Sequence, residues 1–395
     1  MKVLLTSTDN PYVTHLGGKH IHLLLLEQGL KKLGLEVTTL YYDPKSPKEL
    51  AKRSLLQVFP EKRKYETKLN WMTNYLRKRI PSKEFDIIHA HDVLSISAVD
   101  LMPQKKVLTL HGYFARENIE FIKSEKDRKT IYPLLFQIEK IAMKTADYLI
   151  TVDRRLKEYV IAEFDLPPNI ITVMHNAVDT SKFAPISKEN QRELKKNMGI
   201  DPNHFVILVP RRLVEKNGVI FAVRAMKHIE NKSLKMVIAG DGPEKENIIK
   251  EAEGDTRIQL VGTIPHDKIN QYYKTADIIL IPSITSHGVQ EASSIAMLEG
   301  MACSKVAICS AIGGMNEIIQ NMKNGVLTNE KDPADIARAI EAVIENRDLA
   351  TEIGENAREY VLKNHSFTAH AERVFNIYRD ALREEENSVH YRPRI

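Results

Sequence analysis

The chain has 395 residues, 43% hydrophobic and 28% charged, with a net charge of +5; this is typical of a soluble globular protein long enough for two domains. The opening apolar run is too short for a signal peptide, and no stretch approaches the ~20 apolar residues that span a bilayer. Two cysteines, Cys303 and Cys309, exclude a disulfide framework and are expected to be buried thiols in a reducing, cytoplasmic compartment.

Residues 1–180 are predicted to form a parallel α/β domain. The apolar run KVLLTST (residues 2–8) predicts a buried strand, which is followed by a turn containing Gly17 and Gly18, a helix that ends at Gly34, and a second strand. This βαβ unit begins a doubly wound sheet. Further strands are predicted at residues 85–91, 106–112, 147–153 and 171–179.

A basic segment follows the second strand. Residues 45–83 contain twelve Lys and Arg against three Glu, and residues 1–180 carry 28 basic against 22 acidic residues, a net of +6. Apolar side chains, among them Leu55, Leu56, Phe59 and Trp71, interrupt the charges. The pattern is compatible with a solvated helical face, or with a contact to an anionic membrane surface, nucleic acid or a phosphorylated substrate.

A second α/β pattern begins after a polar stretch at residues 181–204, which predicts a second domain over residues 181–367. A last helix at residues 368–386 is compatible with packing on either domain. Two such domains facing each other would form a cleft, with ligands at the carboxyl ends of the strands. The predicted strands of this domain lie at residues 205–213, 234–242, 258–264, 277–283, 305–311 and 325–329.

Histidines follow several of the predicted strands, at His89, His91, His111 and His175. A zinc site is not expected, because no cysteine or His-x3-His pattern accompanies them. A neutral histidine that donates a hydrogen bond to a substrate hydroxyl or phosphate is the favoured interpretation.

Arginines and a lysine follow the strand at residues 205–209, in the sequence VPRRLVEKNG. Arg211 or Arg212, together with Lys216, is well placed to bind a diphosphate, although surface charges at a strand exit would give the same pattern. The turn at Gly17 and Gly18 is likewise compatible with a ligand contact or a structural turn. The small-residue turns at 238–244 and 310–319 are interpreted as structural.

Two glutamates, Glu291 and Glu299, are eight positions apart, with apolar residues at helical spacing from 295 onward. We expect Glu291 near the start of a helix and Glu299 about two turns inside it. Eight helical residues rise ~12 Å, too far for an acid/base pair at one bond. Two acceptors at this separation, with helix N-terminal amides between them, suit a nucleotide-sugar.

In their order along the chain, these segments resemble the family 4 retaining glycosyltransferases of the GT-B fold. HNAVDTSKFAP resembles that family's N-G-V-D…F-x-P segment, and PRRLVEKNG its G-R-L-x-x-x-K-G. EASSIAMLEGMACSKVAICSAIGGMNEII resembles its E-x7-E block. The resemblance covers almost the whole chain and implies two Rossmann-like, doubly wound α/β domains facing a cleft. Departures include Ala177 and Ser294, which stand where the family has glycine.

The resemblance also implies roles for individual residues. Glu291 would contact the donor sugar and Glu299 the ribose, and Arg211 with Lys216 would bind the diphosphate. The remaining implied positions are Gly17 and Gly18 near the phosphates and acceptor, His111 near the reacting carbon, and Ser293 and Ser294 beside the sugar.

The sequence therefore predicts a cytoplasmic, retaining, metal-independent glycosyltransferase that uses a UDP-, GDP- or ADP-sugar and no further cofactor. Peripheral contact with an anionic membrane is an open possibility for residues 45–83, and nucleic acid is not an expected partner. A nucleotide-sugar epimerase of the same fold and a non-catalytic sugar-nucleotide-binding protein are the alternatives. An oxidoreductase is disfavoured because the chain has no G-x-G-x-x-G fingerprint.

Overall fold

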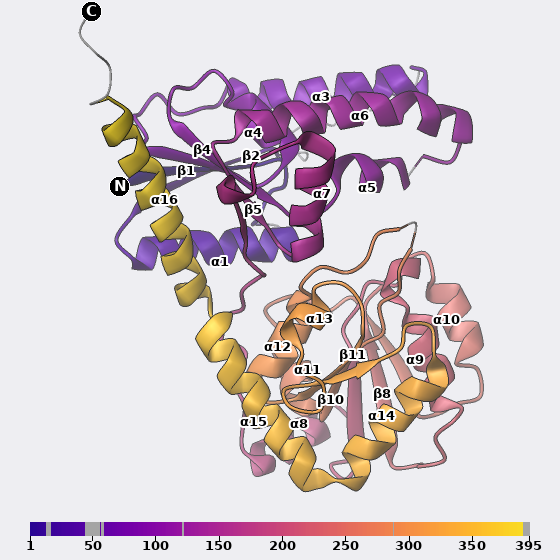
Figure 1. Cartoon of the computed structure of the whole chain (residues 1–395). Coiled ribbons are helices and arrows are strands. Elements are labelled where there is room, and N and C mark those ends of the chain that lie inside the picture. The colour runs from indigo at the N-terminus through magenta and orange to yellow at the C-terminus, as the bar shows by residue number, and fades with distance from the viewer. Residues whose placement is uncertain (13–16, 44–55, 57–58, 121, 287, 390–395) are drawn as a thin grey trace, which may run out of the picture. The chain divides into compact units, whose positions relative to one another are not determined.

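A computed structural model describes residues 1–12, 17–43, 56, 59–120, 122–286 and 288–389, shown in Figure 1. Of the basic segment at 45–83, residues 45–55, 57 and 58 lie outside the described part, and Leu55 is among them. Within the described residues, no helix combines the length and the apolar character that a membrane crossing requires.

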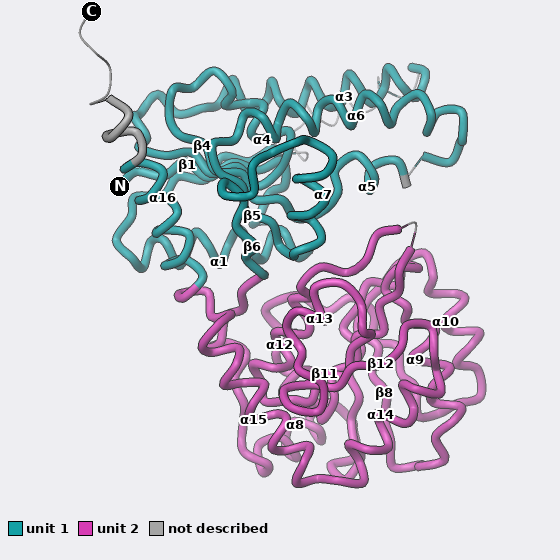
Figure 2. Tube along the Cα trace, in the orientation of Figure 1, with its two compact units in different colours: residues 1–175, 370–395 teal, residues 176–369 magenta. Residues whose placement is uncertain are grey.

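The chain divides into two compact units, coloured separately in Figure 2. Unit 1 comprises residues 1–175 and 370–395, and unit 2 comprises the uninterrupted stretch 176–369. The first crossing therefore lies five residues before the boundary expected at 180/181. The second falls inside the last helix, α16 (Phe367–Val389), which begins in unit 2 and continues into unit 1.

Unit 1 contains a six-stranded sheet in the order β2-β1-β3-β4-β5-β6, with every pairing parallel. Its strands are β1 (Lys2–Ser7), β2 (Glu36–Tyr41), β3 (Ile87–Ala90), β4 (Lys105–Leu110), β5 (Tyr148–Thr151) and β6 (Ile171–Val173). Its helices before α16 are α1 (Gly18–Lys32), α3 (Glu61–Arg77), α4 (Val93–Ala98), α5 (Phe114–Glu120), α6 (Glu125–Thr145) and α7 (Arg154–Phe164).

Helix α16 packs on the core of unit 1. Its buried residues Ala371, Val374, Tyr378 and Ala381 recur at helical spacing and join α1 and the central strands in one cluster. The Tyr378 hydroxyl also lies 2.7 Å from Nδ1 of His89, which is fully buried in β3. Burying a side chain such as Val374 stabilises by roughly 1.5–3 kcal/mol, and each buried methyl group of the alanines adds about 0.8 kcal/mol, so the helix is an integral part of unit 1.

Unit 2 repeats the architecture with the parallel strand order β12-β11-β10-β7-β8-β9. Its strands are β7 (Phe205–Val209), β8 (Leu234–Ala239), β9 (Ile258–Gly262), β10 (Ile278–Ile281), β11 (Val306–Ser310) and β12 (Val326–Thr328). Its other helices are α8 (Lys188–Asn197), α9 (Val219–Met226), α10 (Lys245–Glu251), α11 (Ile269–Thr275), α12 (Ile295–Ala302), α13 (Met315–Ile318), α14 (Pro333–Glu345) and α15 (Arg347–Asn364).

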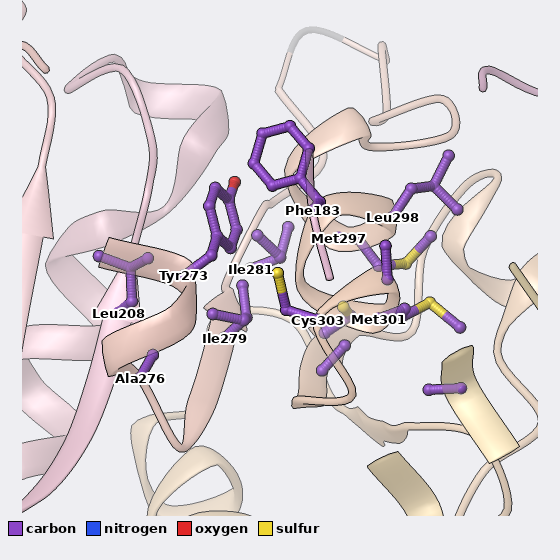
Figure 3. Packing of buried hydrophobic residues seen from close by; sticks show 14 of the residues in the cluster. Phe183, Leu208, Tyr273, Ala276, Ile279, Ile281, Met297, Leu298, Met301 and Cys303 are labelled. Carbon is purple, nitrogen blue, oxygen red and sulfur yellow. The ribbon is translucent and has the colours of Figure 1, made fainter. Parts of the chain in front are cut away.

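Both faces of the second sheet are covered, which explains its uninterrupted apolar strands. In β10, Ile279 and Ile281 belong to the cluster on one face, and Ile278 and Leu280 to the cluster on the other. Figure 3 shows the first cluster, in which α12 packs its apolar side chains against β10. The predicted fold class, two doubly wound parallel α/β domains, is confirmed, and each strand lies in a segment predicted from the sequence, except that β4 begins one residue earlier, at Lys105.

Candidate functional site

The glycine turn of unit 1 forms the start of α1. Gly17 is the N-cap residue with φ −88°, so the turn does not require a left-handed residue there. Among the described residues, a side chain at Gly17 would have room, since the nearest atom outside its neighbours, Nδ1 of His20, would lie 3.5 Å from the added carbon. Gly18 is the first helical residue. The predicted ligand contact of the two glycines stays a prediction.

Lys19, in the first turn of α1, lies between two carboxylates of unit 1. Its Nζ is 2.8 Å from Asp9 and 3.1 Å from Asp92. Burial alone would lower the pKa of Lys19, but the two carboxylates more than offset it and raise that pKa. Burial likewise opposes ionisation of Asp92, yet Lys19 and the backbone N–H groups of Thr8 and Ser95 hold its pKa below the usual value. The three charges form a fixed group at this edge of the sheet.

The predicted residue His111 follows β4, is partly buried, and belongs to a group of imidazoles in which His22 and His91 are buried. Its Nε2 lies 3.5 Å from Nδ1 of His91, and its ring meets that of His22 at a centroid distance of 4.7 Å. Burial lowers the pKa of both His91 and His111 well below the usual value, so both rings are neutral at physiological pH. Nε2 of His91 is buried and has no hydrogen-bond partner among the described residues.

Among the described residues, His22, His91 and His111 form a group whose ligand nitrogens lie within 4.8 Å of one another. Neutral imidazoles are zinc ligands, so the group has the chemistry to bind a metal. Ring contacts and the nitrogen contact between His91 and His111 also account for its packing. The metal-independence of the reaction stays a prediction.

Arg211 organises the corresponding edge of unit 2. It follows β7, is 9% exposed, and its Nη2 forms an ion pair with Glu291 at 2.7 Å. The same nitrogen donates to Asn217 at 2.5 Å and to Ser283 at 2.9 Å, while Nη1 donates to Ser294 at 3.2 Å. Every one of these partners belongs to a connection that follows a strand or precedes a helix of unit 2. One guanidinium group thus joins two connections of unit 2, that between β7 and α9 and that between β10 and α12.

The structure places Arg211, and not Arg212, against Glu291. Arg212 is exposed, whereas Arg211 is buried beside the carboxylate. Lys216 is partly buried; within the described part of the chain its ammonium donates no side-chain hydrogen bond. Burial opposes ionisation of Glu291, but Arg211, then Lys216 and Arg212, hold its pKa below the usual value. Glu291 is therefore ionised, and the positive charge of Lys216 acts on it from nearby.

The structure corrects the expected position of the glutamates in the helix. Helix α12 begins at Ile295, so Glu299 lies just over one turn inside it, and Glu291 lies four positions before it, in non-helical backbone. The estimate of ~12 Å assumed a helical rise throughout, and that assumption is wrong for residues 291–294. Ser294 has extended backbone angles, φ −62° and ψ 117°, which end the helix on its N-terminal side.

Glu299 has partners different from those of Glu291. It is 5% exposed, and its Oε1 lies 3.3 Å from Nε2 of His266. Tyr273 donates its hydroxyl to the same carboxylate; burial, followed by this negative charge, raises the pKa of Tyr273 well above its usual value. Lys182 donates to the carbonyl of His266 at 2.8 Å. Separate partners fit the inference that the two glutamates do not share a proton.

The two predicted serines use their hydroxyls inside the protein. Ser293 Oγ accepts from the backbone N–H of Asn176 at 2.9 Å, and Ser294 Oγ accepts from Arg211. Ser293 is 2% exposed and Ser294 1%. A direct contact of either side chain with a ligand stays a prediction.

Glycine turns that were interpreted from the sequence as structural hold the site segments together. A Cβ at Gly240 would lie 1.9 Å from the carbonyl oxygen of Arg211. A Cβ at Gly314 would lie 2.8 Å from backbone atoms of Ala292 and Ser293. Both turns therefore allow a backbone approach that any other residue would block. Their place after β8 and β11 was visible in the sequence, but the approach itself was not.

Other residues of the site were not predicted from the sequence. Asn217 lies within the quoted segment VPRRLVEKNG, where it was given no role, and Ser283 follows β10, so their positions after strands were a usable signal. His22 lies on a helix, and His266 and Tyr273 lie in and after the loop that follows β9, where no recognised pattern marked them. Asn176 was part of a quoted segment but was given no role.

Two family models match adjacent parts of the chain. The model described as Glycosyltransferase Family 4 matches residues 16–182, and that described as Glycosyl transferases group 1 matches residues 190–360. The chain belongs to the family 4 glycosyltransferases. The predicted family is thereby confirmed, and glycosyl transfer is its activity, whereas retention of configuration stays a prediction.

Curated relatives match this glycosyltransferase over most of its length. A component of the phosphatidylinositol N-acetylglucosaminyltransferase of Arabidopsis thaliana is 24% identical over 98% of this chain and 84% of its own. The UDP-Gal:alpha-D-GlcNAc-diphosphoundecaprenol alpha-1,3-galactosyltransferase of Escherichia coli is 28% identical over 78% of each chain. An uncharacterized glycosyltransferase of Methanocaldococcus jannaschii is 25% identical over 97% of this chain and 99% of its own.

Solved structures share the fold of this glycosyltransferase. Sucrose-phosphate synthase from Thermosynechococcus elongatus has a TM-score of 0.76 at 19% identity and covers 96% of this chain and 98% of its own. The Anabaena protein HepE, solved in complex with UDP-glucose, has a TM-score of 0.69 at 16% identity over 96% and 100%. The fold is GT-B, as expected.

Proposed function

We propose that this chain transfers a sugar from a nucleotide-diphosphate-sugar to an acceptor hydroxyl with retention of anomeric configuration. The observation that carries the proposal is the group formed by Arg211, Glu291 and Lys216 beside the N-terminus of α12. It combines cations for a diphosphate, a carboxylate for sugar hydroxyls and helix amides for an anion. The complexes of HepE with UDP and UDP-glucose support a donor of this class.

In this mechanism, unit 2 holds the donor. Glu299, buried in α12, would accept hydrogen bonds from the ribose hydroxyls, and Glu291 from the transferred sugar. Lys216 and the first amides of α12 would take up the charge that develops on the departing diphosphate, with Arg211 fixing the carboxylate beside them. These groups supply the stabilisation of the leaving group, and therefore we propose that no metal is needed.

The reaction is balanced without a protein nucleophile. The bond between the anomeric carbon and the diphosphate oxygen breaks, and the acceptor oxygen bonds to that carbon on the same face. The acceptor proton passes to an oxygen of the leaving diphosphate. His111, which is neutral, would donate or accept a hydrogen bond near the reacting carbon, as the family resemblance implies.

The acceptor is proposed to be lipid-linked. The names of two relatives give phosphatidylinositol and a diphosphoundecaprenol compound as acceptors. In unit 1, the basic helix α3 exposes Lys62, Arg63 and Lys68. We propose peripheral binding of the cytoplasmic protein to an anionic membrane through this segment. Co-sedimentation with liposomes that does not depend on anionic lipid would contradict it.

A thermal-shift panel of UDP-, GDP- and ADP-sugars tests the donor class. A ligand at 100 times its dissociation constant adds about 2.7 kcal/mol of stability, which is easily measured. Once a donor is found, NMR of the product reports its anomeric configuration. Conversion of the donor without an acceptor would indicate an epimerase instead, and binding without turnover a non-catalytic protein.

A further inference from the structure

Asn176, the first residue of unit 2, contacts the segment that leads into α12. Its backbone N–H donates to Ser293 Oγ at 2.9 Å, and its side-chain Nδ2 donates to the Ser293 carbonyl oxygen at 2.8 Å. Asn176 is 8% exposed and Ser293 2%. The two residues are 117 positions apart, so this pair of hydrogen bonds links distant parts of unit 2.

Asn176 is itself held by the other end of unit 2. Its carbonyl oxygen lies 3.1 Å from Nδ1 of His365, and the backbone N–H of Val178 donates to the His365 carbonyl at 2.9 Å. Phe367 then donates to the carbonyl of Val178 at 3.1 Å. The residues that connect unit 2 to the rest of the chain are therefore paired with each other, and Asn176 is fixed on that pairing.

Residues 291–294, which Asn176 contacts, are anchored from two further directions. Arg211 binds Glu291 and Ser294 through its guanidinium group. Gly314 donates its N–H to the Glu291 carbonyl at 3.2 Å, and its lack of a side chain permits the approach. Gly314 thus holds the backbone of Glu291, where the segment begins, and Arg211 holds the side chains of its first and last residues, Glu291 and Ser294. Asn176 alone among these three binds the backbone carbonyl next to the start of α12.

We propose that Asn176 is a positioning residue for the sugar-binding part of the donor site, acting through the carbonyl and hydroxyl of Ser293; this inference rests on the proposed function. The backbone of Ser293 lies between Glu291 and the first amides of α12. Holding it fixes the carboxylate that would bind the sugar relative to the amides that would face the diphosphate. Glu299 lies a turn further along and is held by His266 and Tyr273, so the ribose contact is independent of Asn176.

Hydrogen exchange of the ligand-free protein tests the positioning directly. In Asn176→Ala and in the isosteric Asn176→Asp, which both lose the donor at Nδ2, we expect amides of residues 292–298 to exchange at least ~10-fold faster than in the wild type. Wild-type exchange there in both folded variants would overturn the proposal. Ser293→Ala, which removes only the hydroxyl acceptor, should give a smaller change at the same amides. If the Asn176 variants do not fold, Ser293→Ala decides: exchange at the wild-type rate in that variant would then overturn the proposal.

Asn324 provides a matched control in the same unit. It is 3% exposed, donates to the Ile318 carbonyl at 3.2 Å and accepts from the Gln320 N–H at 2.7 Å. Asn324→Ala should raise exchange around residues 318–324 and leave residues 292–298 unchanged. Faster exchange at 292–298 in this variant as well would indicate general loosening and overturn the specific role of Asn176.

Binding of UDP and UDP-glucose separates positioning of the sugar site from a general loss of stability. We expect Asn176→Asp to weaken UDP-glucose at least ~10-fold more than UDP, since the ribose contact at Glu299 is preserved. Equal weakening of both would overturn the sugar-specific part. If the wild type binds neither probe, the UDP form of the proposed function fails, and the exchange measurement still decides the role of Asn176.

Discussion

The guanidinium group of Arg211 and the carboxylate of Glu291 form an ion pair of 2.7 Å at the edge of the second sheet. Both side chains are largely buried, at 8% and 19% exposure, and three further groups accept from the same guanidinium. A residue predicted to bind a diphosphate thus also positions a residue predicted to bind a sugar. Loss of either partner leaves the other charged and poorly solvated.

Arg211→Ala should therefore reduce stability as well as transfer. We expect a loss of roughly 2–4 kcal/mol in the free energy of unfolding, somewhat less than for a fully buried pair because Glu291 keeps some solvent contact. Denaturant unfolding measures it. The neighbouring, exposed Arg212 is the control, since Arg212→Ala should change stability by no more than ~0.5 kcal/mol. A larger loss in Arg212→Ala than in Arg211→Ala would reverse the assignment.

Lys216→Ala should separate activity from stability. Because its ammonium makes no side-chain hydrogen bond within the described residues, the free energy of unfolding should change by no more than ~0.5 kcal/mol. Transfer should fall at least ~10²-fold, on the scale of one lost stabiliser of the transition state. Glu291→Ala should cause a similar loss of transfer. Initial rates with the donor found by the thermal-shift panel test both, and wild-type rates would refute the site.

Lys245→Ala is a suitable control for Lys216→Ala. The side chain of this lysine is 44% exposed and pairs with Asp241 at 3.0 Å on the same unit. Its replacement removes one positive charge without touching the group around Arg211, so transfer should stay near the wild-type rate. A comparable loss would mean that the net charge of unit 2, rather than Lys216, governs the rate.

Glu139 makes stability depend on pH near neutrality. Burial raises its pKa to about 7, although the N–H groups of Phe114 and Ala115 and the hydroxyl of Tyr159 donate to its carboxylate. Between about pH 4.5 and about pH 7, the folded state therefore keeps a proton on Glu139 that the unfolded state has released. The contribution of Glu139 to the free energy of unfolding falls as the pH rises through this range.

Glu139→Gln should flatten this part of the pH profile. With 1.36 kcal/mol per pKa unit, the contribution lost by the wild type is of the order of 3 kcal/mol or less. Unfolding curves between about pH 4.5 and about pH 8 measure it, with the exposed Glu125→Gln as control. Parallel profiles for Glu139→Gln and the wild type would show that Glu139 titrates in its ordinary range.

Gly314→Ala and Gly17→Ala should behave oppositely. At Gly314 the added carbon meets the backbone at 2.8 Å, so we expect a loss of about 1–3 kcal/mol and poor donor binding. At Gly17 there is space, so stability should fall by no more than about 1 kcal/mol, the cost of a poorer N-cap. If the Gly17 turn contacts substrate, transfer should nevertheless drop. Unfolding and rate measurements on both variants check this. A wild-type rate of transfer in Gly17→Ala would contradict the proposed contact between this turn and the substrate.

Metal independence is also open to measurement. We expect transfer to persist after dialysis against EDTA, because cationic side chains and helix amides are proposed to stabilise the leaving diphosphate. Metal analysis of the purified protein should give less than one equivalent. A stoichiometric metal that is lost in His91→Gln would contradict this and would place an ion among His22, His91 and His111.

The fold was predictable because strands covered on both faces appear as continuous apolar runs, as β7 and β10 do. The motif order was equally informative, since Arg211, Lys216 and Glu291 do lie in one unit and Arg211 contacts Glu291. The start of α12 was misplaced. Ser294 is a common N-cap residue and could have marked the boundary, but the spacing of the glutamates was given more weight.

Contacts between residues far apart in the sequence were not predictable. Ser293 bonds to Asn176 across 117 positions, and no local pattern encodes such a partner. The imidazole group has the same origin, because His22 on a helix joins His91 and His111 only when the sheet packs against α1. A single sequence specifies each element locally, whereas these partners depend on how the elements pack.

The paired ends of unit 2 bear on how this enzyme could be rebuilt. Residues 176–369 form one uninterrupted stretch, and Val178 bridges to Ser366 where that stretch enters and leaves. The unit therefore resembles an insertion into the chain of unit 1. A gene segment with two adjacent junctions would carry Arg211, Lys216, Glu291 and Glu299, the proposed donor contacts of unit 2, so donor preference could be exchanged between homologues as a cassette while the host half is left intact.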